Sequence, residues 1–224
     1  MMNKSLNIVH IGKCGGTTVR EAIAKSQKLR NQFNTLKVTH VSKPIYNPSE
    51  NYLFIIRSPI SRTLSSFNWR KYLMHDQKQR DRFLGERQVL EKYDTLENIA
   101  ENLYCPESRF LNLNVDREFQ MIHHIRENIS FYLYDFLKQI KPDQIYGVIK
   151  QHSINSDCSS LLGVDSIEYG KKNGISSFIP PEDQLSSLAL VNLRRYLVKD
   201  YECLIKLWSL NAIAQDDLEI LLAS

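Results

Sequence analysis

The 224-residue sequence has few of the features that mark specialised protein classes. Its four cysteines are far apart and form no C-x-x-C pair. This excludes a disulfide framework and a cysteine zinc site, and it indicates reduced thiols in a cytosolic protein. No run of 18 apolar residues is present, so no transmembrane segment is expected. Internal repeats and low-complexity tracts are absent as well.

An excess of charge is also lacking. The chain has 29 Lys and Arg residues against 25 Asp and Glu residues, which gives a net charge of +4. The cations are scattered along the chain, so this mild excess suits an anionic small ligand and argues against nucleic acid as a partner. The length and the 42% hydrophobic content predict one domain over residues 1–224.

The stretch that organises the rest of the chain is residues 6–20. Residues 6–11 are apolar and predict a strand, after which a glycine-rich turn leads into a helix. The first N–H groups of a helix have no internal partners and attract anions, and Lys13 adds a full positive charge. We interpret the turn as a phosphate cradle. The alternative is a plain connection with a solvated lysine, because the stretch is neither a Walker A sequence nor a G-x-G-x-x-G fingerprint.

Residues 52–66 repeat this pattern of strand, polar break and helix start. Pro59 suits the first helical position after Ser58, a plausible N-cap. Arg57 ends the strand and Ser65 lies about two helical turns further on, so both are placed to face one anion. The alternative is a capped helix with a surface arginine.

Together the two segments resemble the sulfotransferases that use 3′-phosphoadenosine 5′-phosphosulfate (PAPS), and most closely the carbohydrate (heparan-sulfate-type) branch and its bacterial relatives. The motif K-[TC]-[GA]-G-T-[TS] is matched here by Lys-Cys-Gly-Gly-Thr-Thr at residues 13–18. The motif R-x-P-x-x-R, with a serine eight residues after its first arginine, is matched by residues 57–65. The chain departs from the family at Gly12, where many members have proline, and at Ser58, where Asp or Asn is common.

The resemblance implies a role for each matched residue. The 5′-phosphosulfate would be held by residues 13–18, with Cys14 contributing only its backbone, and the 3′-phosphate by Arg57 and Ser65. A loop with Lys171 and Lys172 resembles the basic loop that closes over the 3′-phosphate, although a plain exposed charge pair would also explain it. No metal is required. The cofactor-binding residues are therefore expected to be Lys13, Cys14, Gly15, Gly16, Thr17, Thr18, Arg57, Ser65 and Lys172.

Two residues are expected to act in catalysis. Lys13 would meet the charge that develops on the leaving phosphate oxygen. His40 follows the second predicted strand, where carbohydrate members of the family place their catalytic histidine, and an unperturbed histidine titrates near pH ~6.5. His40 would therefore take the proton from the acceptor hydroxyl. Its alternative role is structural, and Glu50 and Asp76 are alternative bases.

Strands that alternate with helices predict an α/β fold: a P-loop-like three-layer domain with a central parallel sheet flanked by helices and a helical C-terminal part. The expected strands are 6–11, 36–41, 51–56 and 144–149, and the expected helices are 17–29, 59–74, 95–103, 117–140, 156–163, 185–210 and 216–222. Residues 75–92 are strongly charged and predict a solvated or mobile, substrate-facing lid. His123 and His124 are adjacent, so on a helix they would point apart and chelate poorly.

The function expected is transfer of a sulfuryl group from PAPS to an acceptor hydroxyl, most naturally on a saccharide. Two other classes stay open, a non-catalytic nucleotide or anionic-glycan binding module and an atypical ATP-dependent small-molecule kinase. The first strand begins almost at once, which leaves no room for a signal peptide and favours a cytoplasmic location.

Overall fold

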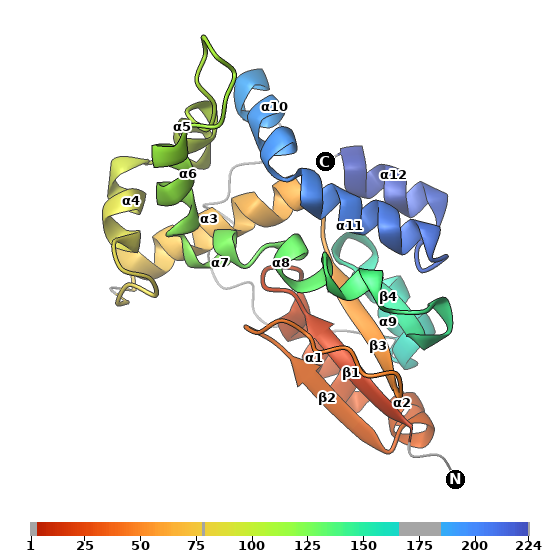
Figure 1. Cartoon of the computed structure of the whole chain (residues 1–224). Coiled ribbons are helices and arrows are strands. Elements are labelled where there is room, and N and C mark those ends of the chain that lie inside the picture. The colour runs from red at the N-terminus through yellow and green to blue at the C-terminus, as the bar shows by residue number, and fades with distance from the viewer. Residues whose placement is uncertain (1–3, 78, 166–184, 224) are drawn as a thin grey trace.

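A computed structural model describes residues 4–77, 79–165 and 185–223. Its four strands are parallel and form one sheet in the order β2-β1-β3-β4 (Figure 1). The predicted α/β fold with a central parallel sheet flanked by helices is therefore confirmed. The strands are β1 (Ser5–His10), β2 (Thr35–Thr39), β3 (Glu50–Ile56) and β4 (Ile145–Lys150).

The first hydrophobic core surrounds the sheet. The apolar side chains of β1 and β3 are fully buried, as expected for parallel strands covered on both faces. Three helices pack together on one face, α1 (Gly16–Lys25), α2 (Gln27–Gln32) and α9 (Ile154–Leu162). The other face is covered by α8 (Ile129–Leu133), η1 (Phe136–Lys138) and α11 (Val198–Ser209). Helix α12 (Gln215–Ala223) packs on α11, η2 (Pro142–Gln144) contacts β3, and η3 (Gln151–Ser153) contacts α9.

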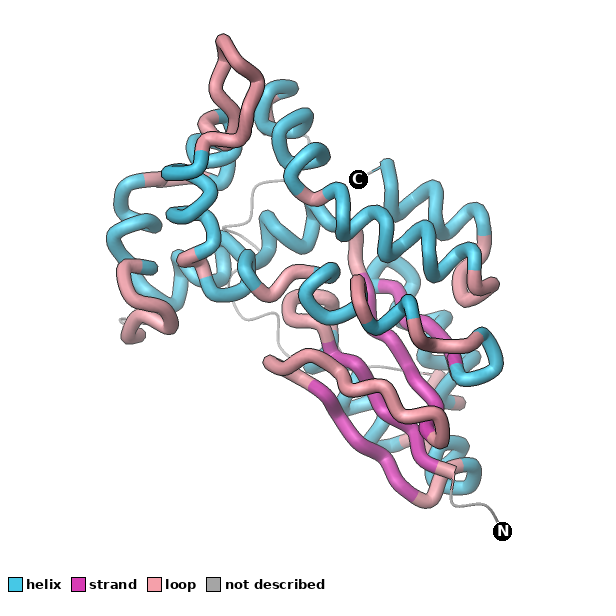
Figure 2. Tube along the Cα trace, in the orientation of Figure 1, coloured by secondary structure: helices cyan, strands magenta, loops and turns pink. Residues whose placement is uncertain are grey.

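A second hydrophobic core lies beyond the carboxyl-terminal edge of the sheet and is built only from helices (Figure 2). Two residues separate β3 from helix α3, which runs away from the sheet into this core and so places side chains at the border between the two cores. The helices of the second core are α3 (Pro59–His75), α4 (Glu86–Lys92), α5 (Leu96–Glu101), α6 (Leu113–Gln120), α7 (His123–Arg126) and α10 (Ser187–Tyr196).

The long helix predicted over residues 117–140 is wrong. The structure breaks it into α6, α7, α8 and η1, because distant side chains satisfy the backbone at the breaks. Arg62 donates to the carbonyl groups of His124 and Glu127, and Asp200 accepts from the N–H groups of Ile129 and Ser130. The breaks turn the first half of the apolar stripe toward the second core and the other half toward the sheet.

Two further predictions need correction. The helix predicted over residues 17–29 is interrupted at Ser26, whose hydroxyl accepts from the N–H of Leu29 and donates to the carbonyl of Leu162. Within residues 75–92, the last part is not a solvated excursion. It forms α4, in which Val89 and Leu90 are buried. Among the residues the structure describes, no helix has the length and apolar character needed to cross a membrane.

Candidate functional site

A cavity of about 390 Å³ lies at the carboxyl-terminal edge of the sheet. The chain leaves β1 on one side to form β2 and returns on the other side as β3, so the ends of β1 and β3 form a topological switch point. Open α/β sheets bind their ligands at such a point. The structure brings eight of the predicted site residues together on the cavity wall: Lys13, Gly15, Gly16, Thr17, Thr18, His40, Arg57 and Ser65.

The cradle has the backbone geometry of an anion-binding turn. Gly15 is the N-cap of α1 and adopts a left-handed conformation with φ of 88°, and Lys13 also has a positive φ of 69°. Such a conformation is uncommon for a lysine and is typically held by its surroundings at functional sites. No side chain caps α1, whereas Ser26 caps α2 and Thr95 caps α5. The first N–H groups of α1 are therefore available to an anion.

Lys13 is held in a strongly positive environment. Its ammonium group lies 4.2 Å from the centroid of the Trp69 ring. Burial lowers the pKa of Lys13, and the nearby guanidinium groups of Arg57 and Arg62 lower it further, to about 8. Lys13 is thus still charged at neutral pH. An anion bound beside it would relieve the repulsion.

One face of α3 supplies the rest of the anion-binding end of the cavity. The Arg57 Nε group donates to the Ser61 hydroxyl at 2.7 Å, and Ser65 and Trp69 follow Ser61 at intervals of four residues, on the same helical face. Arg62, the second arginine of the motif, does not line the cavity. It is fully buried, and its Nη2 group donates to the carbonyl of His124 at 3.0 Å.

His40 directly follows β2, as predicted, and its ring is stacked on the ring of His10 with a centroid distance of 4.0 Å. The Nδ1 atom of His40 lies 2.8 Å from the carbonyl oxygen of His10. Because a carbonyl oxygen only accepts, Nδ1 carries the proton, which leaves the lone pair of a neutral His40 on Nε2. The hydrogen bond to the carbonyl of His10, the last residue of β1, therefore fixes the orientation of the His40 ring and leaves Nε2 as the basic atom.

The stack depends on Gly16. A Cβ atom at position 16 would lie 1.9 Å from two atoms of the His10 ring, a distance that real Cβ atoms do not show. His10 is buried, and this burial is the main reason why its pKa is lowered to about 4. Gly16 therefore serves two purposes, because it opens the first turn of α1 and makes room for a neutral imidazole against which His40 packs.

Five residues of the cavity wall were not identified from the sequence: His10, Gly12, Trp69, His124 and Gln151. Spacing could have revealed Trp69, which lies four residues after Ser65, and Gln151, which directly follows β4. No local signal points to His124. Gly12 stands where many members of the resembled family have proline, and a Cβ atom there would lie 3.1 Å from His124 Nδ1.

The prediction that His123 and His124 point apart is wrong. Their ring centroids are 4.4 Å apart, and their nitrogens and a Glu127 oxygen lie within 4.8 Å of one another. The donor atoms of a tetrahedral zinc site are only about 3.4 Å apart. Burial is the main reason why the pKa of His124 is lowered to about 2, and His123, Arg62 and Lys13 contribute. The positive charges of Arg62 and Lys13 would repel a metal cation, so this cluster does not fit a metal.

The remaining predicted residues lie elsewhere. The Cys14 side chain is fully buried in the first core, and burial raises the pKa of its thiol to about 11. Glu50 begins β3 and is separated from the cavity by the length of the strand, roughly 20 Å for seven residues. Asp76 follows the far end of α3 and does not line the cavity. Lys172 lies outside the described residues.

The chain matches no protein-family model, no curated protein and no solved structure.

Proposed function

We propose that the chain is a PAPS-dependent sulfotransferase that acts on a hydroxyl group of a saccharide. The observation that carries the proposal is the convergence of three separate segments on one cavity. Residues 13–18 provide an uncapped helix start with a lysine, Arg57 and Ser65 provide a second polar wall, and His40 provides a base.

The cavity residues fit a ligand with two phosphate groups. One group would bind at the start of α1, where Thr17 and Thr18 line the cavity together with Lys13. The other would bind at the guanidinium group of Arg57 and the hydroxyl of Ser65, which face the same cavity from the start of α3. An AMP-like ligand would use only the first of these walls.

Bound PAPS would supply an activated sulfuryl group. The bond between acceptor oxygen and sulfur forms as the bond between sulfur and phosphate oxygen breaks. Lys13 would stabilise the negative charge on the leaving oxygen, and His40 Nε2 would take the acceptor's proton and release it to solvent. Positioning and charge stabilisation thus account for the roles of both residues.

A kinase with the same sheet is favoured less. Among the described residues that line the cavity there is no aspartate or glutamate, and a magnesium nucleotide is normally held with the help of one or two carboxylates. A binding module without activity would have the same cradle, and His40 separates it from an enzyme.

The direct test compares adenosine 3′,5′-bisphosphate with AMP and ATP by isothermal titration calorimetry. We expect the bisphosphate to bind about tenfold or more tightly than AMP, because charge-assisted hydrogen bonds contribute about 1.5–3 kcal/mol each. Arg57→Ala should remove this preference, and Arg117→Ala, which changes an exposed arginine on α6, should keep it. Equal affinities for the bisphosphate and AMP would contradict the proposal.

Transfer of radiolabelled sulfate from PAPS to a panel of oligosaccharides then tests for catalysis. His40→Ala should lower the rate about 10²–10⁴-fold while the bisphosphate still binds normally, because general base catalysis contributes about that much. His75→Ala, at the exposed end of α3, is the matched control. If His40→Ala lowers the melting temperature and the rate falls only with the folded fraction, the residue is structural.

A further inference from the structure

A separate cavity, of about 430 Å³, lies where β4 ends and where α11 is followed by α12. Lys150, the last residue of β4, lines this cavity, and Gln151, the next residue, lines the first cavity. The two cavities have no lining residue in common. The volume is within the range of small-molecule sites. Because Trp208 forms part of the wall, we call this space the Trp208 cavity.

Trp208 presents an aromatic surface that the fold does not use. The chain has two tryptophans, and the other one, Trp69, packs against the Tyr72 ring and the Lys13 ammonium group. Trp208 lies near the end of α11 and is 41% exposed, and its ring contacts no other ring and no cation among the described residues. The indole therefore offers a flat apolar surface and an N–H group to a ligand.

Ion pairs fix a carboxylate on the opposite wall of the cavity. The Lys150 ammonium group lies 2.9 Å from one oxygen of Asp217 and 3.0 Å from an Asp157 oxygen. The other oxygen of Asp217 lies 3.2 Å from the Nε2 atom of His152. Each carboxylate oxygen still has a free lone pair, and the ammonium group has a third proton. The Asp217 carboxylate is thus both oriented and able to accept from a ligand.

Two amide side chains complete the polar wall. Asn211 directly follows the C-cap of α11, and its side-chain amide has no hydrogen-bond partner among the described residues. The Gln215 amide donates to the Glu219 carboxylate at 2.8 Å, which leaves its carbonyl oxygen able to accept. The cavity therefore combines one aromatic face with several uncharged donors and acceptors.

The charges around this cavity disfavour an anion. Asp157 and Asp217 carry two negative charges against the one positive charge of Lys150, so a phosphate, sulfate or carboxylate group would be repelled. A cationic amine could stack on the indole. It is favoured less, because Lys150 and His152 already hold both oxygens of Asp217.

We propose that the Trp208 cavity is a second saccharide-binding site, in which an uncharged sugar unit stacks on Trp208 and hydrogen-bonds to Asp217, Asn211 and Gln215. A sugar ring has an apolar C–H face for the indole and hydroxyl groups that both donate and accept. The inference goes beyond the proposed function, because this site would hold a saccharide without taking part in sulfuryl transfer.

The proposal is tested with three uncharged oligosaccharides, cellotetraose, maltotetraose and tri-N-acetylchitotriose, and with choline as the cationic probe. Binding to the unaltered protein is measured by ligand-observed NMR. In Trp69→Phe the only tryptophan left is Trp208, so its fluorescence reports on this cavity alone. We expect at least one oligosaccharide to bind saturably, with a Kd below about 1 mM, and to change the emission of Trp208.

Three variants locate the binding. Trp208→Ala should abolish it, and Ile205→Ala, which changes another exposed residue of α11 outside the cavity, should retain it. Asn211→Gly removes the amide and permits the left-handed backbone that Asn211 adopts, with φ of 56°. This variant should weaken binding about three- to tenfold, as expected for one lost hydrogen bond. Thermal denaturation of each variant checks that it is folded.

The proposal is overturned if no oligosaccharide binds saturably, if choline alone binds, or if folded Trp208→Ala and Asn211→Gly both bind like the unaltered protein. None of these results depends on sulfuryl transfer. Failure of the proposed function appears separately, as equal binding of adenosine 3′,5′-bisphosphate and AMP. Trp208→Ala should bind the bisphosphate with unchanged affinity, because Trp208 does not line the first cavity.

Discussion

Lys13 and Lys150 lie at the same edge of the sheet, and their surroundings are opposite. Lys13 follows β1 by three residues, faces the Trp69 ring and is close to two guanidinium groups. Lys150 ends β4, and its ammonium group lies 3.0 Å from an Asp157 oxygen and 2.9 Å from an Asp217 oxygen.

The pKa values of the two lysines move in opposite directions. Burial and like charges lower the pKa of Lys13 to about 8. Burial also acts to lower the pKa of Lys150, but the hydrogen bonds that its ammonium group donates to Asp217 and Asp157 outweigh this effect and raise the pKa. A lysine whose charge is balanced stabilises the fold. A buried lysine among other cations keeps its charge for a ligand, and the four predictions below test this difference.

The largest effect is expected for Lys13→Met. Removing one group that stabilises developing charge typically costs about 10²–10³ in kcat. We therefore expect a loss of this size in sulfuryl transfer, with the melting temperature unchanged or raised, because the variant removes repulsion with Arg57 and Arg62. Steady-state kinetics and thermal denaturation measure both. A variant that keeps its kcat and loses only affinity for adenosine 3′,5′-bisphosphate would show that Lys13 binds the nucleotide but does not stabilise the developing charge.

Lys150→Met should have the converse effect. It leaves two carboxylates, both mostly buried, without their cation, and breaking such a pair costs about 3 kcal/mol. We expect the free energy of unfolding in urea to fall by about that amount, while kcat per folded molecule stays the same. Lys37→Met, on the exposed side of β2, is the control and should change neither quantity. An unchanged free energy of unfolding in Lys150→Met would contradict the comparison.

The histidines near Lys13 should make the fold sensitive to acid. The folded pKa values of His10 and His124 are lowered to about 4 and about 2, mainly by burial, whereas an unfolded histidine titrates near ~6.5. Below pH ~6.5 the unfolded state therefore binds more protons than the folded state. The free energy of unfolding should therefore decrease as the pH is lowered, by up to about 1.4 kcal/mol per pH unit for each of the two histidines. Urea titrations at pH 7, 6 and 5 measure this slope, and His124→Asn should reduce it. A free energy of unfolding that does not change between pH 7 and pH 5 would contradict the lowered pKa values of these histidines.

The smallest effect concerns alkaline pH. Because Lys13 must be protonated to attract a phosphate group, the affinity for adenosine 3′,5′-bisphosphate should fall about tenfold between pH 7 and pH 9, through the lowered pKa of about 8. In Lys13→Arg the guanidinium stays charged over this range, so the affinity should not change with pH. Calorimetric titrations at pH 7, 8 and 9 decide the matter. A slope that persists in the arginine variant would assign the titration to another group.

The convergence of the strand-end residues on one cavity follows from one rule, that parallel strands end at a common edge. The rule placed Lys13, His40 and Arg57 together, because each follows the end of a strand. The periodicity of the helix then placed Ser65 with them. The same two rules apply to Gln151, which directly follows β4, and to Trp69, which lies four residues after Ser65 on α3. Most residues of the cavity wall can therefore be located from the ends of strands and the faces of helices.

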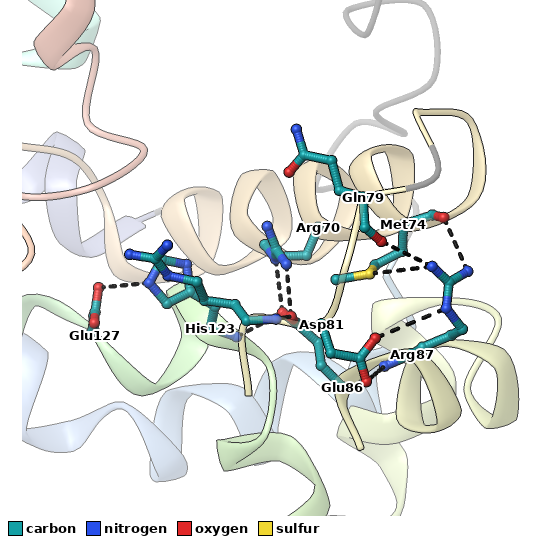
Figure 3. Close-up of polar contacts among 9 residues, drawn as sticks. Arg70, Met74, Gln79, Asp81, Glu86, Arg87, His123 and Glu127 are labelled. Atoms are coloured by element: carbon teal, nitrogen blue, oxygen red, sulfur yellow. Dashed lines mark hydrogen bonds and ion pairs between the residues drawn. The ribbon is translucent and has the colours of Figure 1, made fainter. Parts of the chain in front are cut away.

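The remaining features depend on contacts between residues far apart in the chain. The breaks in residues 117–140 come from Arg62 and Asp200, which are about 60 to 70 residues away, and no periodic pattern records such contacts. Glu86 lies in a charged stretch that favours a solvated surface, and only the tertiary structure buries it against Arg70 (Figure 3). The burial of Glu86 could not have been predicted from the sequence for this reason.

The close approach of Gly16 to the His10 ring has an evolutionary consequence. Any side chain at position 16 would occupy space that the imidazole already fills, so position 16 cannot change while His10 is present. In related sequences the two positions should covary. A residue larger than glycine should appear at position 16 only where position 10 has become small, and such lineages should also have changed position 40, which has lost its stacking partner.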